Sequence, residues 1–451
     1  MAELEKAGVP TVAFVARSFE KDWYGSARVF GVRQLRHALV PRPFVGLTAE
    51  DIVPFVDAAF ETVVKMLTDS KAAELTSEAS SSICSEILEF DGDDRHDAFE
   101  LMNRTFLERG WGDGFPLWEP TRERVNAMLT ATRRPANQLV AVLAPGMGRA
   151  TVEKIAINAV MAGCKPEHMP LLIAAVEAIN DPHFMLRTTA QSTGAHAPFM
   201  LVNGPIVKTL GINTGRCALG PGAQSAVNTT LGRAIRIFYM NLGHAYPGLM
   251  DMDTLGSPTK YSMCLGENLE ASPWPPYHVD KGFGPEDNVV TMQPTYGLSE
   301  VEDNYGTTPQ AILNTVCSNA CARGIKSVGY WLLGQRADPV ARVQVKEKHL
   351  LIVCPVHAAV FAKHGWTRQN IREYMHEHAR IPFEQLISNL SPAAFRKSHP
   401  DMQDLWDSPQ TPIPILESPE CFEIIVAGGM GGRSTYSLGA AEPVSRLIGD
   451  R

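Results

Sequence analysis

A long stretch rich in Gly, Pro, Asn, Thr and Ser, residues 183–300, most constrains how this chain can fold. Extended loops of this length inside a compact protein are usually functional. Regular segments with the pattern of strands and helices flank this stretch on both sides. We therefore predict an α/β protein with a long loop-rich centre, and the flanking segments suggest two similar lobes.

The N-terminal segment predicts a smaller unit. Two apolar strands, PTVAFVA and RHALVPRPF, are separated by an expected loop and followed by the amphipathic segment LTAEDIVPFVDAAFETVVKML. This pattern is half of a doubly wound fold, because a parallel sheet needs more strands than two. We predict a partial, flavodoxin-like α/β unit over 1–74, a polar linker over 75–97 and a main α/β domain over 98–451.

Composition narrows the possible partners. The 451 residues include 41 Lys and Arg against 49 Asp and Glu, a net charge of -8. This balance argues against nucleic acid and anionic membranes as partners, but it leaves room for a small anionic substrate held by local arginines. No apolar run reaches the roughly 18 residues of a membrane span, and the eight cysteines are scattered as in a reducing cytoplasm. We therefore expect a cytoplasmic protein.

The segment MAGCKPEHMP, residues 161–170, places a thiol between two apolar helices. Pro166 suits the first position of a helix, so Cys164 precedes a helix N-terminus, where the macrodipole stabilises a thiolate. His168 is then close enough to exchange a proton with the thiol. The alternative is a buried, inert cysteine, since cysteine is among the most buried residue types.

The segment KYSMCLGENLEASPWPPYHVDKG, residues 260–282, gathers a thiol, carboxylates and an imidazole. Such groups are a plausible set for acid–base or nucleophilic catalysis. The same groups could bind a metal, although the gap between Cys264 and His278 matches no standard zinc spacing. A structured loop covering a sheet is the other alternative. With the preceding segment, this makes the candidate catalytic residues Cys164, His168, Cys264, Glu267, Asn268, Glu270 and His278.

Two glycine-rich segments suggest anion binding. GINTGRCALGPG leads into a helix with arginines, and the strand FEIIV runs into AGGMGGR. Backbone N–H groups of such turns can cradle a phosphate or carboxylate. The alternative is tight loops with surface arginines. The candidate substrate-binding residues are Arg216, Gly220, Gly222, Arg233, Gly429, Gly431 and Arg433.

Cys317 and Cys321 lie four positions apart, on one face of a predicted helix. This spacing could serve a metal or a redox pair. Because no second pair of ligands accompanies them, two cysteines facing the core are favoured.

Several long motifs resemble those of one bacterial family. They are ELEKAGVPTVAF, VPRPFVGLTAEDI, RGWGDGFPLWEPTRERV, INAVMAGCKPEHMP, GINTGRCALGPG and KYSMCLGENLEASPWPPYHVDKGF. Over nearly its whole length the chain resembles the UGSC family, named for selenocysteine or cysteine followed by Gly-Ser-Cys. In fused members that motif lies just upstream of the ELEK helix, and this sequence starts at Met1 inside that helix. The resemblance implies either a small partner subunit that supplies the CGSC half, which we favour, or loss of that half.

The resemblance also implies sulfur chemistry at an activated carboxyl group. We therefore expect a thiol-dependent enzyme that acts on an acyl thioester, including sulfur transfer that forms a thiocarboxylate. The cofactor is left unknown: an acyl-CoA-type substrate fits, and a transition metal stays open. The alternatives are a metal-dependent lyase or hydratase and a non-catalytic subunit of a heteromeric complex. Either way we expect an oligomer.

Overall fold

The computed structural model describes residues 1–32, 35–44, 47, 49–68, 87–332, 343–387 and 400–449. The chain forms two compact units. The first comprises Met1–Glu89, Pro247–Met252 and Pro382–Thr411, and the second comprises the remaining segments. Helices and mixed sheets together confirm the α/β class. Among the described residues, no helix is both long enough and apolar enough to cross a membrane.

The first unit contains a parallel pair of strands, β1 (Ala13–Ala16) and β2 (His37–Val40). The loop expected between them is wrong, because α2 (Glu20–Val29) occupies most of that segment. Parallel strands need a crossover connection, and α2 supplies it. The other helices described in this unit are α1 (Ala2–Lys6), α3 (Ala49–Thr68), α15 (Phe383–Ile387) and α17 (Gln403–Asp407).

The second unit contains two four-stranded sheets. The first has the order β14 (Val444–Leu447), β7 (Val289–Thr295), β5 (Ala197–Asn203), β6 (Cys264–Gly266). The second has the order β12 (Phe422–Val426), β9 (His349–Val353), β13 (Arg433–Ser437), β8 (Ser299–Glu302). Each sheet contains one parallel pair, β6 with β5 or β12 with β9. The inner strand of that pair is antiparallel to the next strand, β7 or β13, which in turn is antiparallel to the edge strand, β14 or β8. The edge strand β8 of the second sheet directly follows β7 of the first sheet in sequence, and the edge strand β14 of the first sheet directly follows β13 of the second. The two sheets thus exchange one edge strand each.

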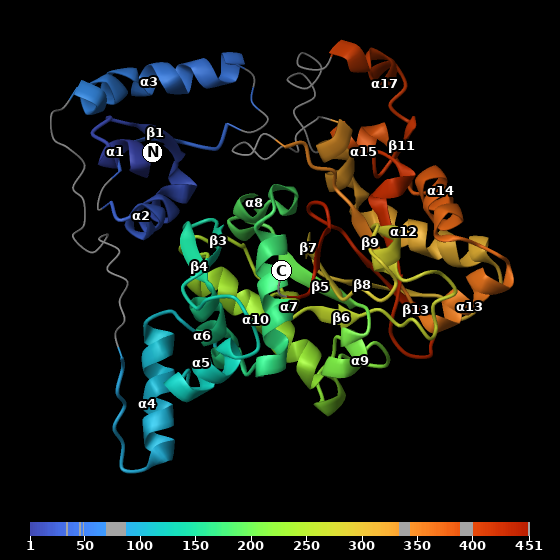
Figure 1. Cartoon of the computed structure of the whole chain (residues 1–451). Helices are drawn as coiled ribbons and strands as arrows, with labels where there is room; N and C mark the ends of the chain where they lie inside the picture. The colour runs from blue at the N-terminus through green and yellow to red at the C-terminus, as the bar shows by residue number, and fades with distance from the viewer. Residues whose placement is uncertain are drawn as a thin grey trace. The chain divides into compact units, whose positions relative to one another are not determined.

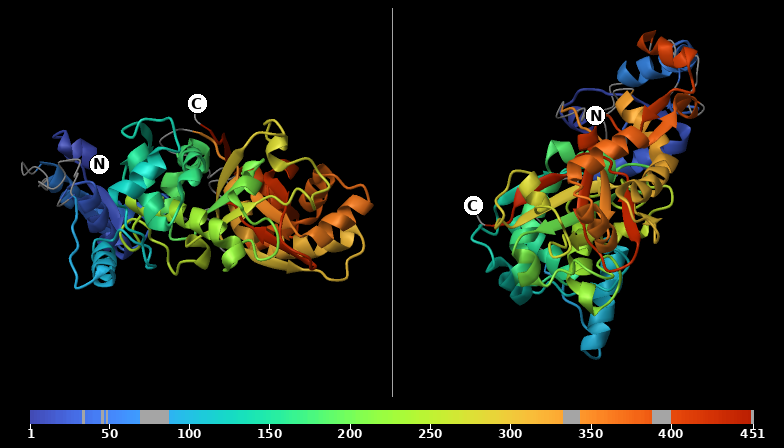
Figure 2. Two further views of the ribbon diagram at one scale, coloured as in Figure 1. Left: turned by 60° about the horizontal axis from the view of Figure 1, so that its bottom comes forward. Right: turned by 90° about the vertical axis from the view of Figure 1, so that its right-hand side faces the viewer.

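The two sheets share one core. Ala197, Phe199 and Leu201 of β5 alternate along one face, and they pack in the same cluster as Leu350 and Ile352 of β9. Helices cover the outer faces: α7 and α10 contact the first sheet, while α12 and α14 contact the second. Figure 1 shows this order from left to right, and Figure 2 gives two further views of it. The second unit is therefore layered as helices, sheet, sheet, helices.

Shorter elements and helices complete the second unit. A hairpin joins β3 (Leu139–Leu143) to β4 (Gly148–Thr151), and β10 (Arg380–Pro382) pairs with β11 (Pro412–Pro414). The α-helices are α4 (Arg95–Glu108), α5 (Arg122–Leu129), α6 (Val152–Ala162), α7 (Met169–Ile179), α8 (Leu186–Ala190), α9 (Ile206–Leu210), α10 (Ala226–Asn241), α11 (Tyr277–Asp280), α12 (Pro309–Leu332), α13 (Pro355–Lys363) and α14 (Arg368–His378).

The predicted loop-rich centre also contains two strands that the sequence analysis did not identify, β5 and β7, which are buried along their whole length. The helix predicted after its glycine-rich loop is α10. Both strands contain a proline, and β7 also carries buried polar residues such as Gln293. These residues hid the strand pattern, because proline and polar side chains are usually found outside central strands.

Candidate functional site

A cysteine lies at the carboxyl end of β9, a strand paired on both sides. Cys354 directly follows β9 and is the N-cap residue of α13, with Pro355 at the first helical position. Proline is favoured there because its missing N–H has no partner to lose. The strand and the helix together fix the backbone of Cys354 in the second unit (Figure 1). Cys354 is only 3% exposed.

His357 follows on the first turn of α13 and completes a buried polar cluster. Its Nδ1 lies 2.7 Å from Ser434 Oγ, and its Nε2 lies 2.8 Å from the backbone oxygen of Asp303. Ser434 Oγ also accepts the backbone N–H of Cys354 at 3.1 Å. A carbonyl oxygen can only accept, so Nε2 carries a proton in either charge state. Nδ1, which lies against the Ser434 hydroxyl, is therefore the ring nitrogen that can gain or lose a proton.

The charges of this cluster favour a thiolate. Burial raises the pKa of Cys354, but interactions with the side chain, backbone N–H and charge of His357, together with the Ser434 hydroxyl, outweigh burial and lower it. Burial lowers the pKa of His357, yet the Cys354 thiol and the Asp303 carbonyl outweigh it and raise that pKa. Opposite shifts in neighbouring groups are the mark of a thiolate–imidazolium pair.

Predicted site residues from other segments lie around the end of β12, next to Cys354. The N–H of Ala427 donates to Val353 O at 3.1 Å, and the N–H of Asn268 donates to Val426 O at 2.8 Å. A Cβ on Gly429 would lie 2.9 Å from Cβ of Arg216, so the two glycine-rich segments touch at this point. The fold thus brings Asn268, Arg216, Gly429 and its neighbour Gly431 to the strand ends that hold Cys354. Arg216 and Gly431 are exposed.

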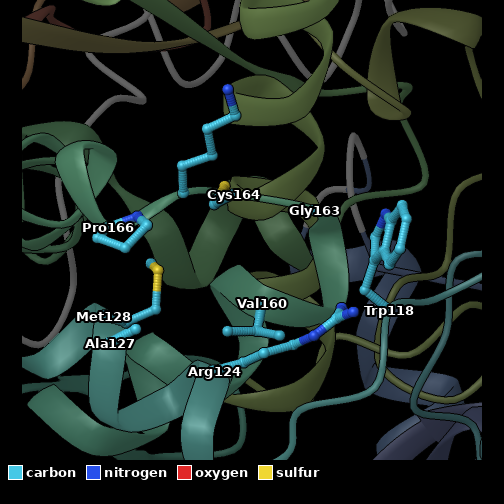
Figure 3. Close-up of a pocket in the computed structure, with 9 residues that line it drawn as sticks. Trp118, Arg124, Ala127, Met128, Val160, Gly163, Cys164 and Pro166 are labelled. Carbon is cyan, nitrogen blue, oxygen red and sulfur yellow. The ribbon is translucent and has the colours of Figure 1, made fainter.

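The predicted thiolate at Cys164 is wrong. Burial raises the pKa of Cys164 far above its ordinary value, and the charge of Arg233 lowers it only in part. The thiol points to Thr230 O at 3.9 Å. His168 provides no base, because its Nδ1 accepts the backbone N–H of Lys165 at 3.2 Å and burial lowers its pKa. Cys164 nevertheless lines a cavity of about 270 Å³ (Figure 3).

Two further catalytic candidates, Cys264 and Glu267, are buried in the protein interior. Cys264 is 1% exposed, and burial raises its pKa well above the ordinary value. Burial likewise raises the pKa of Glu267, whose Oε1 accepts from Arg368 at 2.8 Å and whose Oε2 accepts from Asn203 at 2.5 Å. The backbone N–H of Tyr277 also donates to Oε2, at 2.7 Å. A carboxylate with both oxygens taken up this way is a poor general base, so the assigned role of Glu267 is wrong.

His278 and Glu270, the last two catalytic candidates, lie in opposite environments. His278 is fully buried, and burial lowers its pKa, whereas Glu270 is exposed. An acid–base pair needs both groups within reach of one substrate atom. No hydrogen bond or ion pair within the described residues joins either of them to Glu267.

Two of the predicted anion-binding arginines are already paired. Arg233 forms a two-pronged ion pair with Asp113, at 2.7 Å from Nε and 2.9 Å from Nη2. Arg433 binds Glu300 and Glu302 at the surface. Both charges are neutralised, so these residues hold neighbouring segments together. Gly220 and Gly222 lie in the same loop as Arg216, where Gly222 has a φ of 126° that favours glycine.

The paired cysteines of α12 face the protein interior. Cys317 is buried, and burial raises its pKa to about 12. Cys321 is half-buried, with its sulfur 3.4 Å from Arg380 O. Over the described ranges, no three or more His, Cys, Asp or Glu side chains are grouped so as to hold a metal ion.

Comparison with known proteins gives one match. The model of the UGSC family matches residues 2–69, which contain β1, α2, β2 and α3. The N-terminal part of the chain is therefore similar to the UGSC family. No curated protein and no solved structure matches the chain.

The UGSC match ends far before Cys354, so the family comparison does not point to this residue. Sequence reasoning also missed it, since we treated HLLIVCP only as a strand. The available signal was the run CPVH after a buried strand, which places a thiol and an imidazole on the first turn of a helix that begins with proline. The contribution of Ser434 and Asp303 could not be read from the sequence, because they come from distant segments.

Proposed function

We propose that this protein is a thiol-dependent enzyme that acts on the activated carboxyl group of an acyl thioester, with Cys354 as the nucleophile. The polar cluster in which Ser434 Oγ bonds both the His357 ring and the Cys354 N–H carries this proposal, and the opposite directions of the two pKa shifts agree with it. A nucleophile paired with a base that is itself held by a third group is the recurring arrangement in covalent catalysis. Here Asp303 and Ser434 hold the base.

The first step forms a new thioester on the protein. The Cys354 thiolate attacks the carbonyl carbon of the substrate, and the bond from that carbon to the leaving sulfur then breaks. The leaving thiolate takes the proton of the His357 imidazolium, so the free thiol departs and His357 becomes neutral. The Asn268 amide and N–H groups of the Gly429–Gly432 segment stabilise the oxyanion, as donors aimed at developing charge do in other enzymes.

The second step releases the acyl group to an acceptor. Attack by hydrosulfide on the S-acyl group of Cys354 gives a thiocarboxylate and releases the Cys354 thiolate. Attack by water gives a carboxylate instead, and the second proton of the water passes to solvent. Neutral His357 accepts the proton of the attacking nucleophile in either case, and this returns the pair to its starting charge state.

Arg216 and the glycine loop are the proposed binding site for the anionic part of an acyl-CoA-type substrate. The loop has positive φ at Gly428 (93°) and Gly431 (142°), conformations that other residues rarely adopt. Because Cys354 is 3% exposed, we propose that this loop moves aside when substrate enters. The side chains of Arg216 and Met430 are exposed beside it.

Two features of the first unit support the proposal of a partner subunit. Within the described residues, β1 and β2 pair only with each other, and an isolated two-stranded sheet is marginal in water. Large apolar side chains of this unit are exposed, among them Phe14, Leu39 and Phe60. We propose that a small subunit adds strands to this sheet. Native mass spectrometry of the chain co-expressed with its genomic neighbours tests this, and a purely homomeric chain would contradict it.

Trapping the acyl-enzyme tests the catalytic proposal. The protein is mixed with an acyl-CoA, quenched in acid and digested, and the acyl mass is sought on the peptide that carries Cys354. We expect the adduct on Cys354 in the native protein and none in Cys354→Ser. Cys421→Ser, a buried cysteine for which burial raises the pKa, is the matched control and should keep the adduct on Cys354. An adduct that persists in Cys354→Ser would reject Cys354 as the nucleophile.

The alternatives have their own outcomes in the same assay. Full turnover by Cys354→Ala in the presence of the native partner would favour the non-catalytic subunit. Loss of turnover on chelation, with one stoichiometric metal in the purified protein, would favour the metal-dependent lyase or hydratase.

A further inference from the structure

The cavity beside Cys164 is a second site, separate from the cluster at Cys354. It has a volume of about 270 Å³ and lies between α5, the end of α6 and the turn that begins at Pro166. Figure 3 shows Cys164, Val160 and Met128 around it, with Trp118 at one side. A water molecule's share of the liquid is about 30 Å³, so the cavity holds more than a few waters and is slightly smaller than a typical drug-sized site.

The walls of this cavity are apolar with a positive edge. Trp118, Ala127, Met128, Val160 and Pro166 supply the apolar surface, whereas the lining contains two cations and no acidic residue. Arg124 is paired with Glu119 at 3.2 Å and lies over the Trp118 ring at 5.0 Å. Lys165 is exposed, and no ion pair joins it to an acid in the described part of the chain. Lys165 is therefore the cation available to a ligand.

The backbone around the cavity leaves few donors for a ligand. The N–H of Trp118 donates to Met161 O at 3.2 Å, and that of Cys164 donates to Ala159 O at 2.9 Å. The N–H of Lys165 donates to His168 Nδ1 at 3.2 Å. Recognition of charge must then come from the Lys165 ammonium group. The Cys164 thiol is neutral, since burial raises its pKa, so it offers a polarizable contact and no repulsion to an anion.

We propose that this cavity binds a small apolar carboxylate, with a ring or branched chain inside and the carboxylate at Lys165. The apolar body gains from leaving water at roughly 25 cal/mol per Å² of buried surface, while the exposed ion pair adds less. This site does not depend on Cys354 being a nucleophile, because it shares no residue with that cluster. Bound ligand would tie α5 to the end of α6 and thereby stabilise the second unit.

Calorimetric titration of the full chain with benzoate and with benzamide, its uncharged counterpart, tests the proposal. We expect benzoate to bind at least about fivefold more tightly than benzamide. Lys165→Met should bring benzoate affinity down to that of benzamide. Lys154→Met, an exposed lysine of α6 outside the cavity, is the matched control and should leave benzoate affinity unchanged.

A filling substitution gives the second arm. Val160→Phe should abolish benzoate binding with little loss of melting temperature, because the new ring occupies the cavity. Where Val160→Phe fails to fold, the comparison of Lys165→Met with Lys154→Met decides instead. Equal affinity for benzoate and benzamide would overturn the carboxylate assignment. Absence of binding at millimolar benzoate would overturn the site.

Discussion

Two segments of this chain set a cysteine just before a proline that starts a helical turn, with a histidine soon after: Cys164 in CKPEH and Cys354 in CPVH. Their chemistry is opposite. Burial raises the pKa of Cys164, whereas His357 outweighs burial and lowers the pKa of Cys354. The difference lies in what each histidine does. His168 accepts a backbone N–H, while the ring of His357 is held by Asp303 and by the Ser434 hydroxyl that also accepts the N–H of Cys354.

This comparison shows that a helix start alone does not make a thiolate. Cys164 precedes a turn of only three residues, Pro166–His168, before α7 begins, and its sulfur points to Thr230 on α10. Cys354 is itself the N-cap of the nine-residue helix α13. An imidazole partner and a helix end act together at Cys354, whereas at Cys164 the charge of Arg233 does not outweigh burial.

Replacing the two cysteines should give the largest contrast. Cys354→Ser should lower the rate of acyl-enzyme formation by at least about a thousandfold, because hydroxyl is a far weaker nucleophile at neutral pH. Cys164→Ser should change that rate by less than about twofold. Rapid-quench mass spectrometry measures both. A large loss in Cys164→Ser alone would reverse the comparison.

Removing the imidazole should give the next largest effect. His357→Asn keeps a polar side chain near Ser434, but an amide cannot be protonated to a cation. The rate of acyl-enzyme formation should therefore fall by about a hundredfold or more. The pKa of Cys354 should rise, as seen in its thiolate absorbance. His168→Asn is the control and should leave the titration of Cys164 unchanged. An unaltered Cys354 titration in His357→Asn would break the proposed pairing.

The end of a strand in the first sheet gives a stability prediction. Glu267, directly after the edge strand β6, is buried with Arg368, whereas the thiol pair lies after β9, an inner strand of the second sheet. Glu267→Gln removes one of the two carboxylates that pair with the buried Arg368 guanidinium, Asp280 being the other, and this should reduce the free energy of unfolding by about 2 kcal/mol. Chemical denaturation measures it. Acyl-enzyme formation by the remaining folded protein should be unchanged, and a selective loss of that reaction would restore Glu267 as a catalytic residue.

The pH dependence of the reaction should show a window. Below the lowered pKa of Cys354 the thiol is protonated and cannot attack, so the rate rises as pH increases through that pKa. Above the raised pKa of His357 the imidazolium is lost and the leaving thiolate receives no proton, so the rate falls again. The pH profile of single-turnover acylation checks both limbs. A rate that only climbs toward alkaline pH would match an ordinary thiol.

The smallest effect concerns the first turn after Cys164. His168→Ala removes the acceptor of the Lys165 N–H and should lower stability by about 1 kcal/mol, the usual loss when a cap is removed. Thermal unfolding detects it. No change in acylation is expected, and a change there would link the two segments.

The sequence was enough for local elements but not for the site. Apolar runs predicted the fully buried strands β9 and β12, and apolar residues at helical spacing predicted α6 and α14. Pro166 at the first position of its turn was also correct. The sequence left a thiolate and a buried, inert cysteine open at Cys164, because burial there is set by the packing of α6, α7 and α10. Arg233 could not be assigned either, since Asp113 comes from a distant loop.

Titrating the thiolates by their ultraviolet absorbance tests the central claim most directly. The spectrum of the native protein is compared with those of Cys354→Ser and Cys164→Ser over the range in which the protein stays folded. We predict that the Cys354 difference titrates below about 8.5, the value of a free cysteine, while the Cys164 difference shows no transition there. A Cys354 thiol that titrates at or above that value, or a Cys164 thiol that titrates below it, would contradict the account.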